Sequence, residues 1–418
     1  MNLTGTDKKI EKALLVAVFT GKTDDEQSFL ELKSLAESAG AEVTAMISQN
    51  KGSPDTAIYV GSGKLDEIKE FAENNEVDIL IFDDELTPTQ TRNLERETNL
   101  PVIDRTLLIL DIFALHARSS EGKLQVELAQ QQYLLPRLVG LGGQLSRLGG
   151  GIGTRGPGET KLESDRRHIR RHIDSVKQQL EDVKKRRDNL RKHRKKLGVI
   201  TVAIVGYTNA GKSTLMNLLT NAGVLAEDKL FATLDPTARE LKLTNGKSVM
   251  LIDTVGLIRR LPHNLIKAFR STLEEAAEAD IILNICDASD DEAVTHLEVT
   301  RDLLSELDSS DKPVITVLNK CDVVSGIFDA PFIGDAVRIS AKTGEGVDVL
   351  IKAIEKNMPV SQMKVKLLLP FSMSGMAAKI REQGVVYCEE YRADGIFIEA
   401  LADLKVAQQL TEYFIEEN

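Results

Sequence analysis

The chain has 418 residues, a hydrophobic content of 42% and a formal net charge of −11. This length predicts about three domains, and this hydrophobic content is enough for ordinary buried cores. The three cysteines, Cys286, Cys321 and Cys388, lie far apart without paired spacing, which argues against a disulfide framework or a zinc site. The amino terminus is polar, and no apolar run approaches the roughly 18 residues that span a bilayer. We therefore expect a soluble, unexported, cytoplasmic protein.

The first part of the chain alternates between short apolar runs and helix-like stretches. Strands are expected at Ala13–Phe19, Val43–Ile47 and Asp78–Phe82, with helices at Phe29–Ala39 and Lys64–Asn74. Strands that alternate with helices indicate parallel pairing. The sequence thus predicts a small N-terminal α/β domain over residues 1–138.

Composition changes sharply at the end of this domain. Helical patterns at Thr106–Ala117 and Leu124–Leu138 complete the domain, and a Gly-rich loop is expected over residues 139–160. Nine glycines lie between Gly140 and Gly158, together with Arg147 and Arg155 and almost nothing that could form a core.

Residues 161–197 are the most basic segment of the chain. From Lys161 to Gly198, fifteen Lys or Arg stand against six Asp or Glu, a net charge of +9 that leaves −20 for the rest of the chain. Apolar residues recur mostly at steps of three or four, which predicts a narrow apolar stripe on a long, coiled-coil-like charged helix or on a helical hairpin. The stripe consists of Ile169, Ile173, Val176, Leu180, Val183, Leu190 and Leu197.

Residues 198–359 carry short polar motifs that follow buried-strand candidates. The expected strands are Val199–Val205, Val249–Ile252, Ile281–Cys286 and Val314–Leu318. Ligand-binding groups gather at the carboxyl ends of parallel strands, so the pattern predicts an α/β domain with a doubly wound, mostly parallel sheet.

Residues 360–418 show a β-α-β-β-α pattern, which predicts a small α+β domain.

The segment Gly206–Ser213 matches the phosphate loop G-x-x-x-x-G-K-[ST]. In such a loop, glycines let backbone N–H groups converge on phosphate oxygens at a helix amino terminus, where the dipole also favours an anion. Lys212 is expected to contact the β- and γ-phosphates, and Ser213 to bind Mg²⁺. The residues expected around the phosphates are Gly206, Tyr207, Thr208, Asn209, Ala210, Gly211, Lys212, Ser213 and Thr214.

Two later motifs follow in the order that GTP-hydrolysing switch proteins use. One is a threonine within Phe231-Ala232-Thr233, and the other is Asp253-Thr254-Val255-Gly256, directly after a buried-strand candidate. Asp253 is placed to hold Mg²⁺ through water, and the Gly256 amide can sense the γ-phosphate. Their order after a phosphate loop makes coincidence a poor explanation.

The last two motifs predict which base is bound. In Asn319–Asp322, the Asp322 carboxylate can accept both the N1–H and the exocyclic amine of guanine, a contact that adenine cannot make. Bidentate pairs of this kind discriminate by about 1–3 kcal/mol. Lys320 can lie along the base with its aliphatic stem, and in Ser340–Lys342 the Ala341 amide can donate to the guanine carbonyl oxygen. GTP and GDP are therefore the expected ligands in preference to ATP.

This motif set resembles that of translation-factor-class P-loop GTPases, and the surrounding regions resemble the HflX family of ribosome-associated GTPases. The resemblance is carried by residues 231–236, by residues 253–258 and by the Gly-rich run 141–163, and it extends from about residue 59 to about residue 359. It implies that Thr233 is the switch threonine that closes on Mg²⁺ and the γ-phosphate. The implied catalytic set is then Lys212, Thr233 and Gly256, and the implied metal-binding set is Ser213, Thr233 and Asp253.

The same resemblance implies a partner and an output. The partner is the large ribosomal subunit, with the helical segment and the Gly-rich loop directed at its RNA near the peptidyl-transferase region. The output is separation of stalled or idle ribosomes into subunits in the GTP state. Phosphate contacts need positive charge, and a crowded RNA cavity suits backbone without bulky side chains, so Arg147, Arg155 and Lys161 are the expected RNA contacts. A solvated helix face and an interdomain linker are the alternative interpretations, and we expect a monomer.

Leu257 stands where a Ras-like GTPase carries a water-orienting glutamine. An apolar side chain cannot position the attacking water, so we predict slow hydrolysis by the isolated protein and acceleration by the ribosome.

Asn209 resembles the phosphate-loop asparagine of potassium-activated GTPases. K⁺ is therefore a candidate cofactor beside Mg²⁺.

Two functions of other classes stay open. One is an ATP-dependent RNA-remodelling enzyme, because the family's N-terminal region has been associated with ATP and Gly61-Ser-Gly-Lys64 could form a second phosphate loop; a glycine turn before a helix at Leu65–Phe71 explains the same residues. The other is an assembly or sensing GTPase that binds the large subunit without splitting ribosomes.

Overall fold

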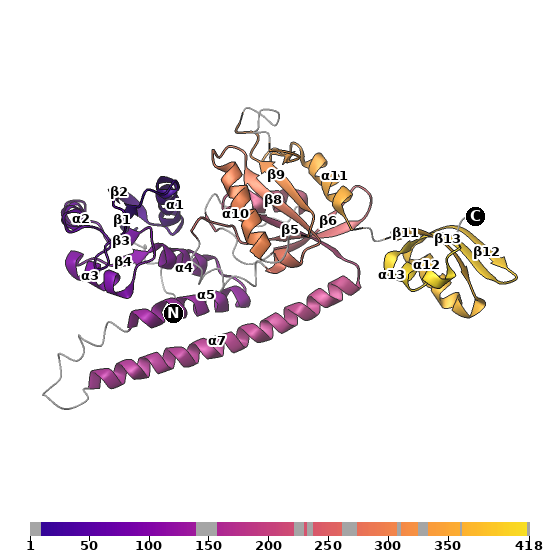
Figure 1. The fold of residues 1–418 in the computed structure, drawn as a ribbon, viewed down its shortest axis with the longest axis horizontal. Helices are drawn as coiled ribbons and strands as arrows, with labels where there is room; N and C mark the ends of the chain where they lie inside the picture. The colour runs from indigo at the N-terminus through magenta and orange to yellow at the C-terminus, as the bar shows by residue number, and fades with distance from the viewer. Residues whose placement is uncertain are drawn as a thin grey trace, which may run out of the picture.

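The computed structural model describes residues 10–138, 157–220, 230–231, 237–260, 274–306, 311–324, 333–359 and 362–415. Figure 1 shows an N-terminal domain at one end, a central domain, and a small C-terminal domain at the other end, with a long helix running beneath the first two. Within the described residues, no helix is both long enough and apolar enough to cross a membrane.

The N-terminal domain is a four-stranded parallel sheet with helices on both faces, as predicted. Its strands, in the order β2-β1-β3-β4, are β1 (Lys12–Phe19), β2 (Glu42–Asn50), β3 (Ile79–Phe82) and β4 (Val102–Asp104). Its helices are α1 (Asp25–Ser38), α2 (Ser62–Asn74), α3 (Pro88–Thr98) and α4 (Arg105–His116). Alternate residues of β1 enter two separate cores, with Leu14 and Val16 among residues of α2 and α3, and Ala13 and Leu15 among residues of α1 and α4.

Helix α3 and strand β4 were not predicted from the sequence. Helix α3 begins with a capping box, in which Thr87 Oγ1 accepts from the Gln90 amide at 3.2 Å and Gln90 Oε1 accepts from the Thr87 amide at 2.8 Å. Pro88 occupies the first helical position, where its missing N–H costs nothing. This start signal is present in the sequence, whereas β4 spans three residues and is too short to show a period.

Two long helices connect the N-terminal domain to the central domain. Helix α5 (Ser120–Arg137) packs beside α7 (Pro157–Lys196), which is a single helix of 40 residues. Figure 1 shows α7 continuing beyond α5 along the central domain. Ile173 and Val176 of the predicted stripe are buried, but Leu190 and Leu197 are 64% and 66% exposed. Leu180 and Val183 are half-buried, so the stripe prediction is wrong only toward the end of α7, where arginines face the central domain instead.

The central domain has a six-stranded sheet in the order β10-β9-β8-β5-β7-β6, in which only β6 is antiparallel. The prediction of a doubly wound, mostly parallel sheet is confirmed. Helices α8 and α11 contribute to the core on one face, and α10 contributes to the cores on the other. The elements are β5 (Ile200–Gly206), α8 (Lys212–Thr220), β6 (Thr237–Lys242), β7 (Ser248–Asp253), β8 (Ile281–Asp287), α10 (Ala293–Glu306), β9 (Val314–Asn319), β10 (Val337–Arg338) and α11 (Val347–Asn357).

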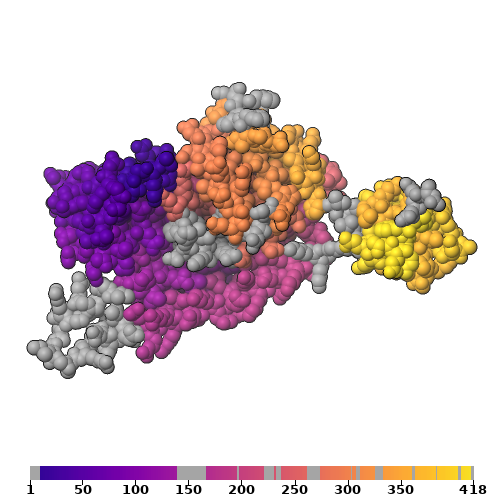
Figure 2. Space-filling model, in the orientation of Figure 1, coloured from indigo at the N-terminus to yellow at the C-terminus, as the bar shows by residue number. Residues whose placement is uncertain are grey.

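The C-terminal domain is a three-stranded antiparallel sheet, β11-β13-β12, with helices packed on one face. Its elements are β11 (Gln362–Leu369), η3 (Phe371–Met373), α12 (Ser374–Gln383), β12 (Val385–Arg392), β13 (Gly395–Asp403), α13 (Leu404–Gln408) and η4 (Thr411–Tyr413). The expected β-α-β-β-α order is present. Figure 2 shows this domain at the end of the molecule away from the N-terminal domain.

Candidate nucleotide-binding site

The predicted phosphate loop connects β5 to α8 at the carboxyl edge of the central sheet. Strand β5 lies between β7 and β8, which is where the winding direction of the sheet reverses and where such sheets bind ligands. Gly206 has a φ of +146°, and a Cβ there would lie 2.1 Å from the Ile285 carbonyl oxygen. Only glycine fits this close approach of the loop to β8.

Asn319 joins three of the sequence motifs through one side chain. Its Nδ2 donates to the Ala210 carbonyl oxygen at 2.8 Å, and its Oδ1 accepts from the Ala341 amide at 2.8 Å. Gly211, with a φ of +89°, leaves room for this amide, because a Cβ there would lie 2.2 Å from Asn319 Nδ2. The structure thus brings the phosphate loop, residues 319–322 and residues 340–342 together, although they are far apart in the sequence.

The Asp322 carboxylate is held by hydrogen bonds that fix its direction. Ser340 Oγ donates to Asp322 Oδ1 at 2.7 Å, and the Thr343 amide donates to Ser340 Oγ at 3.1 Å. Lys320 Nζ lies 2.8 Å from Asp287 Oδ2, while Lys342 is exposed. An oriented carboxylate suits the bidentate reading of a base edge, because less freedom is lost on binding.

Lys212 lies at the end of the site where the sequence motif predicts the phosphates. Lys212 is buried, and its Nζ donates to the Tyr207 carbonyl oxygen at 2.8 Å. Burial lowers the pKa of Lys212 to about 8, against the opposing effect of the Asp253 carboxylate. The amino group is therefore already desolvated before an anion arrives.

Ser213 and Asp253 form a pair suited to Mg²⁺. Ser213 Oγ donates to Asp253 Oδ2 at 2.8 Å, and the Asp253 side chain is buried at the end of β7. Hydroxyl and carboxylate oxygens are the hard ligands that Mg²⁺ prefers, and the ion keeps several waters in sites of this kind. The residues present fit the predicted ion. Thr214 follows on α8, and Ala232 and Thr233 lie outside the described residues.

The segment that follows β7 pairs with the phosphate loop through its backbone. The Thr208 amide donates to the Leu257 carbonyl oxygen at 2.8 Å, and the Leu257 amide donates to the Gly206 carbonyl oxygen at 3.1 Å. The Leu257 side chain is buried, and Thr254 Oγ1 donates to the Ile204 carbonyl oxygen at 2.7 Å. Residues 253–257 are thus part of the same rigid unit as the phosphate loop.

Apolar residues from both switch motifs are buried in the N-terminal domain. Val255 and Ile258 belong to the core that contains α1, α4 and α5. Phe231 has a φ of +58° and packs edge to face on Phe113, with ring centroids 4.7 Å apart. The Leu230 amide donates to Ser38 Oγ at 3.1 Å. The N-terminal domain therefore contacts both of the segments that the sequence predicts to be switches.

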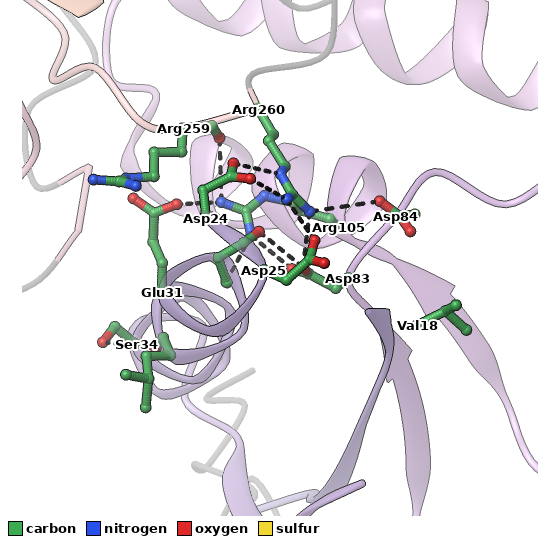
Figure 3. Close-up of polar contacts among 12 residues, drawn as sticks. Val18, Asp24, Asp25, Glu31, Ser34, Asp83, Asp84, Arg105, Arg259 and Arg260 are labelled. Carbon is green, nitrogen blue, oxygen red and sulfur yellow. Dashed lines mark hydrogen bonds and ion pairs between the residues drawn. The ribbon is translucent and has the colours of Figure 1, made fainter. Parts of the chain in front are cut away.

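Arg260 inserts among carboxylates at the carboxyl edge of the N-terminal sheet (Figure 3). Its guanidinium lies 2.7 Å from Asp24 Oδ1 and 2.9 Å from Asp25 Oδ1, and also within 4.0 Å of Asp83 and Asp84. The hydrogen bond from Arg260 lowers the pKa of Asp24, which keeps the carboxylate charged. In an open α/β sheet, this edge is where a ligand is expected, and here a side chain of the central domain fills it.

Arg105 lies at the centre of the same cluster and is 2% exposed. Its guanidinium donates to Asp83 Oδ1 at 2.8 Å, to Glu31 and to the Arg259 carbonyl oxygen at 3.2 Å. It therefore neutralises the buried Asp83 and the partly buried Glu31 of the N-terminal domain, and it also contacts the segment after Gly256.

Tyr207 brings the phosphate loop itself into this contact. Its hydroxyl donates to Glu31 Oε1 at 2.6 Å and accepts from the Arg259 amide. Its ring stacks on His296 of α10, with centroids 3.8 Å apart. Burial raises the pKa of Glu31, opposed by the charge of Arg105. The sequence motif assigned Tyr207 to the phosphate loop but gave no sign of these side-chain contacts.

A cavity of about 340 Å³ separates α1 from the phosphate loop. It is lined by Glu31, Asn209, Asp290, Glu292 and His296, among others. The last three could together hold a metal ion. However, the Arg259 guanidinium is paired with Glu292 and lies 3.5 Å from His296 Nε2, so a positive charge is already present. We assign no metal to this group.

Helix α7 is attached to the central domain by a buried carboxylate. Glu275 is 7% exposed and lies 2.8 Å from Arg191, with Arg187 and Arg194 at 3.7 and 3.8 Å. These arginines come from successive turns of α7. Part of the basic charge of α7 is therefore used inside the protein. Of the predicted RNA contacts, Lys161 lies on α7, whereas Arg147 and Arg155 lie outside the described residues.

Residues Gly61–Lys64 form the start of α2. Gly61 is the N-cap, its amide donates to Gln49 Oε1 at 2.8 Å, and Lys64 Nζ lies 2.6 Å from Glu67. This geometry fits a glycine turn before a helix.

Three family models match the chain. They are described as GTP-binding GTPase N-terminal (residues 26–114), GTP-binding GTPase Middle Region (residues 116–194) and 50S ribosome-binding GTPase (residues 201–320). GTPase HflX from Caldanaerobacter subterraneus subsp. tengcongensis is 49% identical over 405 residues, which are 97% of this chain and 94% of that protein. GTPase HflX from Escherichia coli (strain K12) is 41% identical over 390 residues, 92% of each.

Among solved structures, a complex of SsGBP with GDP covers 83% of this chain and is itself covered to 98%. Its sequence identity is 29% and its TM-score is 0.49.

Proposed function

The chain belongs to the HflX family of GTPases, and we propose that it binds the large ribosomal subunit and, in the GTP state, separates stalled or idle ribosomes into subunits. One observation carries this proposal. The segment after Asp253 contacts the phosphate loop and the N-terminal domain, and Glu275 of the same domain contacts α7. A change at the γ-phosphate can therefore alter the position of the elements that would contact a ribosome.

The phosphate loop supplies the chemistry for binding and hydrolysing GTP. In the proposed assignment, Lys212 and the loop amides bind the phosphates, Ser213 and Asp253 hold Mg²⁺, and Asp322 selects guanine. Mg²⁺, when bound, neutralises phosphate charge. The Gly256 amide would face the γ-phosphate from a segment that Leu257 holds to the phosphate loop through its backbone amide and carbonyl. Thr233 would close over Mg²⁺ in the same state.

The RNA-facing surface in this proposal is the outer side of α7 and the loop before it. The exposed basic side chains of α7 are Arg167, Arg170, Arg171, Lys177, Lys184, Lys185, Arg186 and Lys192. They can contact phosphate groups without sequence preference. Arg147, Arg155 and Lys161 would make the contacts nearest the peptidyl-transferase region. A 50S ribosome-binding family description for residues 201–320 supports this choice of partner, and a ribosomal partner would put the protein in the cytoplasm.

Hydrolysis by the isolated protein should be slow and should accelerate on the large subunit. Leu257 has no group that can orient water, and partners that complete a GTPase site accelerate hydrolysis by about 100-fold or more. Single-turnover GTP hydrolysis, measured with and without purified large subunits, tests this. Fast hydrolysis without the subunit would contradict it.

A variant can separate this stimulation from basal chemistry. Glu275→Gln keeps the shape of the side chain but removes the charge that holds Arg187, Arg191 and Arg194. We expect it to retain the basal rate and to lose most of the stimulation, with Glu298→Gln on the exposed face of α10 as the control. Equal stimulation of both variants would show that α7 does not transmit the signal.

K⁺ should accelerate hydrolysis if Asn209 helps to hold it against the phosphates. Asn209 has a φ of +60° and an exposed side chain in the phosphate loop. A fixed positive charge there would stabilise the charge that develops on the phosphates. We expect a higher single-turnover rate in KCl than in NaCl at the same ionic strength, and no such difference for Asn209→Ala. Equal wild-type rates in the two salts would exclude potassium activation.

A further inference from the structure

Thr208 carries a buried hydroxyl without a partner in the phosphate loop. The residue is 7% exposed, and no group among the described residues accepts from or donates to its Oγ1. Two nearby hydroxyls are satisfied, since Thr254 Oγ1 donates to the Ile204 carbonyl oxygen and Ser213 Oγ donates to Asp253. A buried polar group without a partner destabilises the folded state, so its presence in a binding loop needs an explanation.

The side chain of Thr208 lies where the phosphate loop, Lys212 and Gly256 converge. A Cβ placed on Gly256 would lie 2.8 Å from Thr208 Cγ2 and 3.0 Å from Lys212 Nζ. Lys212 is the residue assigned to the β- and γ-phosphates, and the Gly256 amide is assigned to the γ-phosphate. Thr208 is therefore adjacent to both groups that would surround the terminal phosphate.

One rotation can bring the hydroxyl to this point. Oγ1 and Cγ2 are both bonded to Cβ, so a step of about 120° between staggered χ1 rotamers moves Oγ1 to where Cγ2 now lies. The backbone can stay in place, because the Thr208 amide is fixed by its hydrogen bond to the Leu257 carbonyl oxygen. The Thr208 side chain thus has two rotamers: one places the methyl group toward Gly256, and the other places the hydroxyl there.

We propose that the Thr208 hydroxyl is a catalytic group of GTP hydrolysis, which holds the attacking water against the terminal phosphate in place of the glutamine that Leu257 replaces. A hydroxyl can accept from the water and donate to a γ-phosphate oxygen at the same time. The water oxygen bonds to the γ-phosphorus while the bond from that phosphorus to the β,γ-bridging oxygen breaks. The water proton passes to a phosphate oxygen, and Thr208 keeps its own proton.

This inference rests on the GTPase activity of the family and not on the ribosomal partner. It can therefore hold or fail whatever the outcome with ribosomes. It also explains why a polar side chain is kept in a position where no group among the described residues satisfies it.

Thr208→Val tests the inference, because valine keeps the shape and removes the hydroxyl. Single-turnover GTP hydrolysis by the full-length protein should fall about tenfold or more, while the affinities for GDP and for a non-hydrolysable GTP analogue stay unchanged. Thr208→Ser should restore most of the rate. The nucleotide-free Thr208→Val protein should also unfold at a higher temperature than the wild type, since an unsatisfied polar group has been removed.

Thr254→Val is the matched control for stability. Its hydroxyl has a partner in the Ile204 carbonyl oxygen, so its loss should lower the unfolding temperature. Three results would overturn the inference: a wild-type rate in Thr208→Val, a rate loss accompanied by an equal loss of GDP affinity, or a Thr208→Ser protein as slow as the valine variant.

Discussion

Asp322→Asn should lower the affinity for GTP by about 100-fold and make xanthosine triphosphate the better ligand. The carboxylate accepts two hydrogen bonds from guanine, and a bidentate pair of this kind discriminates by about 1–3 kcal/mol, or up to about two orders of magnitude. Asparagine keeps one acceptor and presents a donor at the second position. Xanthine has a carbonyl oxygen where guanine has its amine, so it accepts from that donor and still donates its N1–H.

Titration with fluorescent guanine and xanthine nucleotides measures this exchange of ligands. Asp311→Asn, an exposed carboxylate in the same domain, is the matched control and should keep the wild-type preference. Asparagine keeps a carbonyl oxygen that can still accept from the Ser340 hydroxyl, so the substitution can preserve this hydrogen bond. Unchanged GTP affinity, or no gain for the xanthine nucleotide, would mean that Asp322 does not read the base.

Arg105→Leu should lower the free energy of unfolding of the N-terminal domain by about 3–5 kcal/mol. The variant removes the ion pairs that Arg105 makes with Asp83 and Glu31. Asp83 keeps Ser28 Oγ and the more distant Arg260 guanidinium, and Glu31 keeps the Tyr207 hydroxyl. Breaking a buried ion pair from one side is still costly, because the remaining charges have lost their water together with their closest positive partner. It also removes the hydrogen bond to the Arg259 carbonyl oxygen that connects the two domains.

Chemical denaturation of the full-length protein measures this loss in the N-terminal transition. Arg96→Leu is the control, since Arg96 pairs with Glu97 on the surface and its side chain is 69% exposed. Surface pairs of this kind contribute about 0–1 kcal/mol. An equal and small decrease in the free energy of unfolding for both variants would mean that the buried cluster does not stabilise the N-terminal domain.

The convergence of the candidate-site motifs at one edge of the central sheet could be predicted because each motif is local. Gly206, Lys212 and Asp322 lie in short segments whose spacing is set by strand-loop-helix geometry, and the fold that joins them follows from the order of buried strands. Their mutual contacts were not predictable in detail. Nothing in the sequence indicates that Asn319 would bond both Ala210 and Ala341, since the three lie in separate segments.

The contact between the domains could not be read from the sequence. Arg260 pairs with Asp24, which is 236 positions away, and Arg105 pairs with Glu31, which is 74 positions away. Isolated charged residues carry no periodic or motif signal. The contacts of helix α7 were also not predictable, because a basic helix indicates exposure to solvent or contact with nucleic acid, whereas Arg187, Arg191 and Arg194 face a buried glutamate. Helix α3 differs, since the capping box at Thr87 is a signal in the sequence from which its start could have been predicted.

The most direct test of the proposed function is sedimentation of intact ribosomes with this protein on sucrose gradients. GTP, a non-hydrolysable GTP analogue and GDP should be compared, with an Arg147→Ala/Arg155→Ala variant alongside. The proposal predicts separated subunits with GTP and with the analogue but not with GDP, and loss of splitting in the variant. Co-sedimentation of the GTP-bound protein with ribosomes that stay joined would contradict it, and would leave an assembly or sensing GTPase as the better account.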